Sequence, residues 1–131
     1  MKDIIVDDFQ ETVNDVLFRH KSIIDVMTKL QESDARLNRA IAKAVTSCGC
    51  IKINAQKQAL PDNIDLNQAS QFVGSHIEGK LCDDCKEIIN QELQNHLFYL
   101  AALCNLLDIN IYDNVLEEYK KLNTLGTYNL L

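Results

Sequence analysis

The chain has 131 residues, of which 47% are hydrophobic and 24% are charged, a balance typical of a globular protein with one core. We therefore expect a single domain over residues 1–131. The formal net charge of −6 argues against nonspecific nucleic-acid binding, because phosphate backbones attract clustered Lys and Arg. No run of about 18 apolar residues occurs, so we expect no membrane span.

Apolar residues recur at three- and four-residue steps through most of the chain, which is the pattern of amphipathic helices. Only 4 Gly and 1 Pro interrupt them, which also favours helices over many short strands. We expect Ser33 to cap the second helix and that helix to continue through Gly49. The prediction is an all-α, four-helix bundle with helices over about residues 8–32, 34–57, 80–107 and 111–124 and a loop over 58–79.

Glu92 is the first candidate for a functional side chain. At 100° per residue it falls on the margin of the apolar stripe of the third predicted helix, with Asn95 just beyond it. A polar group in that position faces a groove between helices, where helical bundles build metal sites from side chains on facing helices. We therefore expect Glu92 to act as a ligand or to form an ion pair.

The segment QELQNHLFYLAALCNLLDINIYDNVLEEYKKLN resembles the second half of the MazG-like, all-α nucleoside triphosphate pyrophosphohydrolases. In that family an EELxDVLxYLxxLxxxLGID helix precedes a short capped helix that ends in Lys and Asn. The resemblance covers about residues 87–123. It implies a nucleotide ligand cleaved at its α–β bond with Mg²⁺ or Mn²⁺, and protomers that self-associate to cover an apolar face. The apolar segment 127–131 fits such self-association.

The resemblance also assigns residues. Glu92 matches the first acid of the family's ExxD pair, whose hard carboxylate oxygens suit Mg²⁺, while Asn95 occupies the position of the second acid. Lys120 or Lys121, with Asn123, match the Lys and Asn that approach phosphate in the family. The second predicted helix has no glutamate for the family's ExxE pair, so half of the expected metal cage is missing. An active hydrolase and a divergent nucleotide-binding relative both remain open.

The cysteines suggest a different site. Cys48 and Cys50 lie late in the second predicted helix, and Cys82 and Cys85 open the third. If these helices pack antiparallel, the C-x-C and C-x₂-C pairs meet at one end, and four thiolates select Zn²⁺ or another soft metal. Within a continuous helix a C-x-C pair points its side chains about 200° apart, so convergence requires the helix to unwind at Gly49.

Two interpretations of the cysteines remain open at this point. In one, they make the chain a non-catalytic, zinc- or redox-responsive helical protein. In the other, they are small apolar residues in the core, a common fate of free cysteine. The N-terminal segment MKDIIVDDFQ lacks the pattern of a signal peptide, and the cysteine count is the odd number five, so we expect reduced thiols in the cytoplasm.

Overall fold

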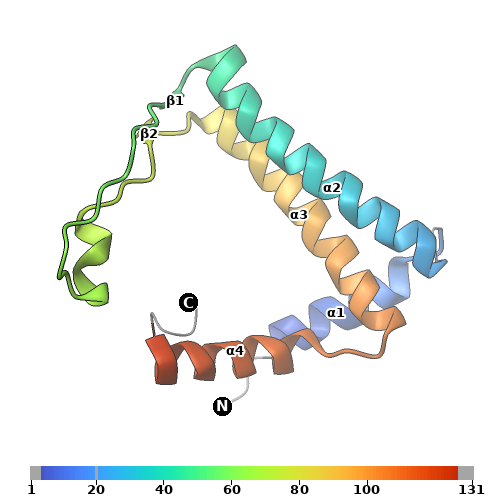
Figure 1. The fold of residues 1–131 in the computed structure, drawn as a ribbon. Helices are drawn as coiled ribbons and strands as arrows, with labels where there is room; N and C mark the ends of the chain where they lie inside the picture. The colour runs from blue at the N-terminus through green and yellow to red at the C-terminus, as the bar shows by residue number, and fades with distance from the viewer. Residues whose placement is uncertain (1–3, 20, 127–131) are drawn as a thin grey trace.

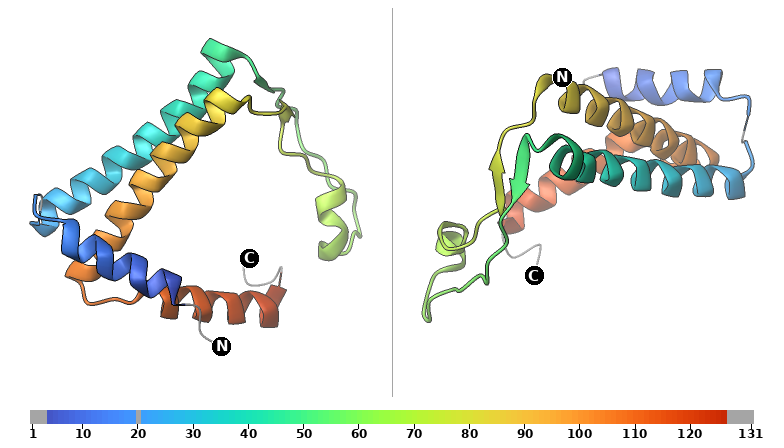
Figure 2. Two further views of the ribbon diagram at one scale, coloured as in Figure 1. Left: turned by 180° about the vertical axis from the view of Figure 1, so that it is seen from behind. Right: turned by 90° about the horizontal axis from the view of Figure 1, so that it is seen from above.

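A computed structural model describes residues 4–19 and 21–126 of the chain, so the apolar segment 127–131 lies outside the described residues. The all-α class predicted from the sequence is confirmed. α2 and α3 lie side by side, and α1 and α4 lie at one end of this pair (Figures 1 and 2). None of the described helices combines the length and the hydropathy that crossing a membrane requires. The helices are α1 (Ile5–Val16), α2 (Ile23–Lys43), α3 (Asp83–Leu106) and α4 (Ile111–Leu125).

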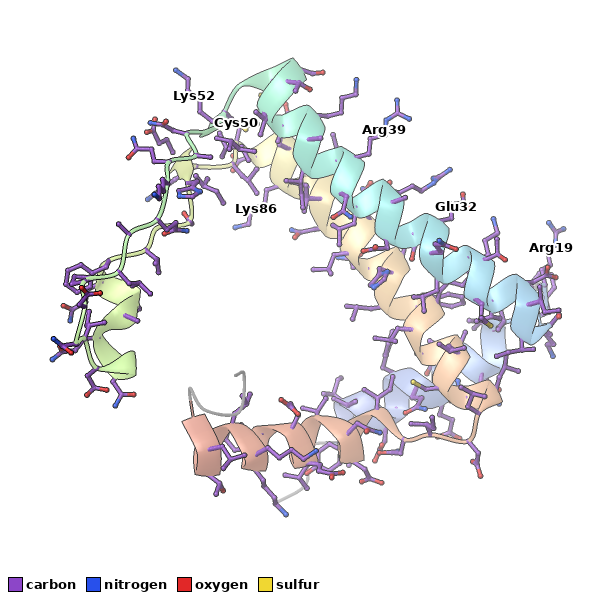
Figure 3. All side chains as sticks on the ribbon, in the orientation of Figure 1. Arg19, Glu32, Arg39, Cys50, Lys52 and Lys86 are labelled. Atoms are coloured by element: carbon purple, nitrogen blue, oxygen red, sulfur yellow. The ribbon has the colours of Figure 1, made fainter. Side chains whose placement is uncertain are left out.

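A two-stranded hairpin leaves the other end of the α2–α3 pair. Strand β1 (Ile51–Ile53) pairs antiparallel with β2 (Ile77–Gly79), and Ile51 lies opposite Gly79. Between the strands lies a short 3₁₀ helix, η2 (Leu66–Gln71). We call residues 51–79 the hairpin arm. With all side chains drawn, the arm remains apart from α1 and α4 (Figure 3), and its main contact with the helices is that of β1 with η1 (Ala44–Cys48), the helical turn that follows α2.

The predicted boundary between the first two helices, at Ser33, is wrong. The chain leaves the helix at Leu17, which has extended backbone angles, and re-enters it at Ser22, whose hydroxyl accepts a hydrogen bond from the Ile24 N–H at 3.3 Å. Ser33 lies inside α2 and is 1% exposed. Its hydroxyl donates to the Leu30 carbonyl at 2.7 Å, one turn back, so the backbone stays helical through it.

The second predicted helix also ends earlier than expected. α2 passes into one turn of π-helix, η1 (Ala44–Cys48), and the helix stops at Gly49, which has a left-handed φ of 80°. Residues expected to be helix as far as 57 instead form β1 and the start of the hairpin arm. A strand of three residues is too short to show a period-two pattern, so the hairpin could not be predicted from hydrophobic periodicity.

The core lies where α1, α2 and α3 meet. Gln10 is buried beside it and fixes the loop between α3 and α4, since its Nε2 donates to the Ile109 carbonyl at 2.6 Å and its Oε1 accepts from the Ile111 N–H at 2.9 Å. Helix α4 buries none of its described residues, and its apolar side is left open. The central cluster of buried residues is small: Val13, Val26, Ala101 and Ala102.

Candidate metal centre

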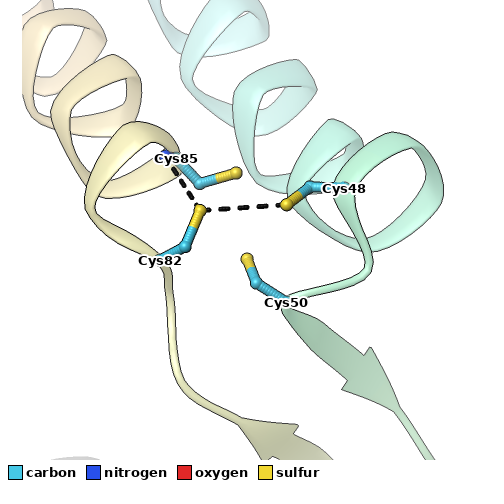
Figure 4. A group of neighbouring side chains, drawn as sticks. All are labelled: Cys48, Cys50, Cys82 and Cys85. Atoms are coloured by element: carbon cyan, nitrogen blue, oxygen red, sulfur yellow. Dashed lines mark hydrogen bonds between the residues drawn. The ribbon is translucent and has the colours of Figure 1, made fainter.

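Four cysteines meet where the hairpin arm joins the α2–α3 pair. The Sγ atoms of Cys48, Cys50, Cys82 and Cys85 all lie within 4.8 Å of one another. Figure 4 shows the four side chains converging from the end of η1 and the start of α3. Cys48 is exposed and the other three are half-buried, so these residues are not core cysteines. Among residues 4–19 and 21–126 this is the one group of three or more His, Cys, Asp or Glu side chains that could hold an ion.

The C-x-C pair converges because the helix ends between its two members. Gly49 takes a left-handed conformation that a residue with a Cβ adopts only at a cost, and its N–H donates to the Ala44 carbonyl at 2.8 Å. Cys48 is thus the last residue of η1, and Cys50 lies beyond the turn. The unwinding at Gly49 that four-cysteine convergence requires is therefore present. It turns the Cys50 side chain back toward the side of the helix that carries Cys48 (Figure 4).

The C-x₂-C pair uses the first turn of α3. Cys82 is the N-cap residue, and its sulfur accepts a hydrogen bond from the Cys85 N–H at 3.4 Å. Three residues later on the same helix, Cys85 lies above Cys82, so both sulfurs face η1. An N–H directed at sulfur stabilises the thiolate form, as does the positive end of the helix dipole.

Gly79 brings the two halves of the site together. In the β1–β2 pair it lies opposite Ile51, next to Cys50. A Cβ added to Gly79 would come within 2.6 Å of the Cys50 carbonyl oxygen, and the φ of Gly79 is 88°. Only glycine allows the two backbones to approach this closely in this conformation. The hairpin register therefore positions Cys50 beside the cysteines of α3.

The thiols differ in acidity because they share hydrogen bonds. The Cys85 N–H, then the Cys85 thiol, lower the pKa of Cys82. Contact with the Cys82 thiol, then burial, raise the pKa of Cys85 to about 12. For Cys48, the Cys50 N–H and the Cys85 thiol act to lower the pKa, but the Cys82 and Cys50 thiols and burial outweigh them and raise it. Cys82 is thus more ready to ionise than Cys48 or Cys85.

The donor set and its dimensions fit zinc. Four Zn–S bonds of about 2.3 Å in a tetrahedron place the sulfurs about 3.8 Å apart. The Sγ atoms of Cys48 and Cys82 are 3.8 Å apart, and the remaining pairs need to close by at most about 1 Å, which side-chain rotation supplies. Four cysteines close together could therefore hold a metal ion such as zinc.

The residues assigned from the family resemblance are spread out. Glu92 is half-buried and lines a groove between α2 and α3, but Asn95 is exposed and does not line it. Lys120, Lys121 and Asn123 lie on α4, outside that groove, and Lys121 pairs with Glu117 at 3.7 Å. Within one chain, the structure does not bring these residues together around Glu92.

The groove that Glu92 lines also has three cationic residues that were not predicted from the sequence as part of a site. Arg36, Arg39 and Lys43 of α2 face it together with Glu92. Their spacing of three and four residues places them on one face of a helix, and this pattern could have identified them from the sequence.

Comparison of the chain with protein families, with curated proteins and with solved structures finds no match.

Proposed function

We propose that this chain is a non-catalytic helical protein whose four cysteines hold one structural Zn²⁺. The observation that carries the proposal is the convergence of two cysteine pairs, from segments far apart in the sequence, with all sulfurs within 4.8 Å. Soft thiolate ligands favour zinc over Mg²⁺ or Mn²⁺. Four cysteines fill the tetrahedral coordination of zinc, and a site without an open position is characteristic of structural rather than catalytic zinc.

The zinc would act as a cross-link between the helices and the hairpin arm. Cys48 ends η1, Cys50 directly precedes the arm, and Cys82 and Cys85 lie where the chain passes from the arm into α3. Because the arm has little other contact with the helices, its position depends on this junction. The thiols must stay reduced to bind metal, so we place the protein in a reducing compartment such as the cytoplasm.

The first test is the metal content of the purified full-length chain. We expect about one zinc per chain, with four of the five thiols protected from a thiol reagent until a chelator is added. Replacing Cys85 by Ser should remove the bound zinc. Replacing Cys104 by Ser is the matched control, because Cys104 lies on α3 outside the cluster and should leave the stoichiometry unchanged. A metal-free protein that does not take up added zinc would refute the proposal.

We further propose that the fold is completed by a second copy of the chain. The structure exposes 10093 Å² of surface. A compact monomer of 14.9 kDa is expected to expose about 7,000 Å², so the excess is about 3,000 Å². Obligate homodimers bury a total of about 2,000 to 5,000 Å², which is about 1,000 to 2,500 Å² of each copy, so a single contact would cover much of the excess but not all of it.

The surface that best fits this contact is the apolar groove between α3 and α4. Tyr119 and Leu122 line it, and Tyr119 is 62% exposed. Replacing Tyr119 by Glu should shift the protein toward monomer in analytical ultracentrifugation. Thr124→Glu adds the same charge to α4 outside the groove and should not. A wild-type chain that is monomeric at high concentration would refute self-association. The other residues of the groove are Leu100, Cys104, Ile109, Ile111, Asn114, Val115 and Glu118.

A MazG-like nucleotide pyrophosphohydrolase is the second candidate function, favoured by the position of Glu92 in the groove between α2 and α3. Its test is pyrophosphate release from a panel of nucleoside triphosphates with Mg²⁺ or Mn²⁺. Activity lost in Glu92→Gln but kept in Cys85→Ser would support hydrolysis independent of zinc. If the zinc-loaded wild type releases no pyrophosphate, the hydrolase function is refuted and only the structural zinc site remains proposed.

A further inference from the structure

The groove between α2 and α3 has an unusual lining for this acidic chain. It has a volume of about 590 Å³, within the range of small-molecule sites. Its lining includes Arg36, Arg39 and Lys43 from α2, against the single carboxylate of Glu92 from α3. Three cations thus gather in one groove of a protein whose net charge is −6.

Two of the cations have no ionic partner within the described part of the chain. Arg36 pairs with Glu32, with Nε and Oε1 3.3 Å apart, so its charge is partly neutralised. Arg39 and Lys43 form no ion pair with any residue the structure describes, and both are exposed. Glu92 lines the groove without forming an ion pair with either of them. Their charges are therefore free to bind an anion.

The zinc centre accounts for at most one of these cations. Zinc with four thiolates carries a double negative charge, and Cys48 and Cys85 form one end of the groove. At 1.5 Å per residue, Lys43 lies about 7 Å along the helix from Cys48, but Arg39 lies about 13 Å and Arg36 about 18 Å away. The screening length at physiological salt is about 8 Å, so only Lys43 is close enough to compensate the centre substantially.

The apolar residues that line the groove indicate which kind of ligand it fits. Ala40 and Ile88 contribute apolar surface to the groove. An apolar floor with a cationic edge fits a molecule with an apolar or aromatic body and an anionic group. Guanidinium groups bind phosphate oxygens in a paired geometry, and ammonium groups bind them as point charges. We infer that this groove binds an organic phosphate directly, without a divalent cation, with Arg39 as the main ligand and Lys43 placed between the phosphate and the zinc centre.

The experiment is calorimetric titration of the zinc-loaded, full-length protein with no added divalent metal. The probes are adenosine monophosphate, phenyl phosphate and inorganic phosphate, with adenosine as the uncharged control. We expect saturable binding of the two phosphate esters, weaker binding of inorganic phosphate and none of adenosine. The affinity should fall as salt is raised, because counter-ions screen the cations.

Matched variants distinguish this site from its alternatives. Arg39→Glu should weaken binding of the phosphate esters at least tenfold, with zinc content unchanged. Lys52→Glu reverses a charge in β1, outside the groove, and should leave binding unchanged. The inference is overturned if the wild type shows no saturable binding or if binding requires added Mg²⁺. It is equally overturned if Arg39→Glu loses its zinc, since the cations would then serve the metal centre.

Discussion

Ser33 and His96, which are 63 residues apart in the sequence, hydrogen-bond through Oγ and Nδ1 at 2.9 Å and tie α2 to α3. Ser33 is buried and His96 half-buried, so each satisfies the other where water has little access. The Ser33 hydroxyl also bonds to the Leu30 carbonyl, which makes it the centre of a short chain of hydrogen bonds. This bond lies along the helix pair whose far end carries the cysteines.

Ser33→Ala should lower the free energy of unfolding by about 1–3 kcal/mol, because the His96 ring nitrogen loses its partner in a half-buried site. Thr28→Ala is the matched control, since the Thr28 hydroxyl bonds only to the Ile24 carbonyl of its own helix and is exposed. Its cost should stay within about 0.5 kcal/mol. Urea unfolding of the zinc-loaded proteins measures both, and equal costs for the two variants would contradict the role given to Ser33.

Gly79→Ala should weaken zinc binding at least tenfold, a difference of about 1.4 kcal/mol. The new Cβ would lie 2.6 Å from the Cys50 carbonyl oxygen, so the strand must shift and carry Cys50 away from the other cysteines. Gly74→Ala is the control, because its nearest neighbour would be 3.9 Å away.

Gly49→Ala separates strain from steric clash. Its φ is also positive, but an added Cβ would meet nothing within 4 Å. We therefore expect Gly49→Ala to lower the free energy of unfolding by about 1–2 kcal/mol because of the left-handed backbone conformation. It should weaken zinc binding less than Gly79→Ala does, because no clash displaces Cys50. Competition with a chromophoric zinc chelator gives the affinities, and a Gly79→Ala variant with wild-type affinity would show that the close approach is not needed.

Zinc affinity should fall steeply as the pH is lowered. The pKa values of Cys48 and Cys85 are raised, so at neutral pH both thiols hold protons in the metal-free protein and zinc must displace them. Each displaced proton changes the binding constant tenfold per pH unit, so these two alone predict about a 100-fold loss between about pH 8 and about pH 7. Chelator competition at several pH values measures the slope, and a slope below one proton would disprove this assignment.

Removing the metal should loosen the hairpin arm more than the helices. The β1–β2 pair is extended by a hydrogen bond from the Asn54 N–H to the His76 carbonyl at 2.8 Å. This paired segment is attached to the helices mainly at the cysteines. Hydrogen exchange of the chelated protein should rise in residues 51–54 and 77–79, while Val26 and Ala101 in the core stay protected. Restoring zinc should reverse the change, and a uniform rise over the whole chain would mean that zinc supports the entire fold instead.

The helical content was predictable from the sequence, because it follows from hydrophobic periodicity. The antiparallel return of the chain also predicted that the two cysteine pairs lie at one end of the helix pair, but not that all four sulfurs converge. The end of α1 at Leu17 and the start of α2 at Ser22 were not predictable, since apolar residues such as Leu17 and Ile23 continue the helical spacing between the two helices. Ser33 resembles a helix cap in sequence, but its hydroxyl serves a tertiary contact with His96 instead. Only the fold reveals which of these uses prevails.

The cysteine geometry turned on one residue. If Gly49 continues the helix, the side chains of Cys48 and Cys50 point apart. If Gly49 ends the helix in a left-handed conformation, as it does, the two side chains come together. Both readings are consistent with a lone glycine in a helical pattern. The role of Gly79 depends on pairing with a strand that the sequence did not predict, so its contact with Cys50 could not be foreseen.

Closing the chain at the cysteines has a consequence for how the protein can vary. A cross-link around a loop of about 30 residues lowers the entropy of the unfolded chain, worth about 3–4 kcal/mol by the relation used for disulfides. That contribution depends only logarithmically on loop length, and each doubling changes it by about 0.6 kcal/mol. With zinc bound at the cysteines, the part of the arm beyond the β1–β2 pair, residues 54–76, can lengthen, shorten or change sequence at little cost to the helices. The junction would thus separate a segment free to diverge from the helices and from the residues that form the metal site.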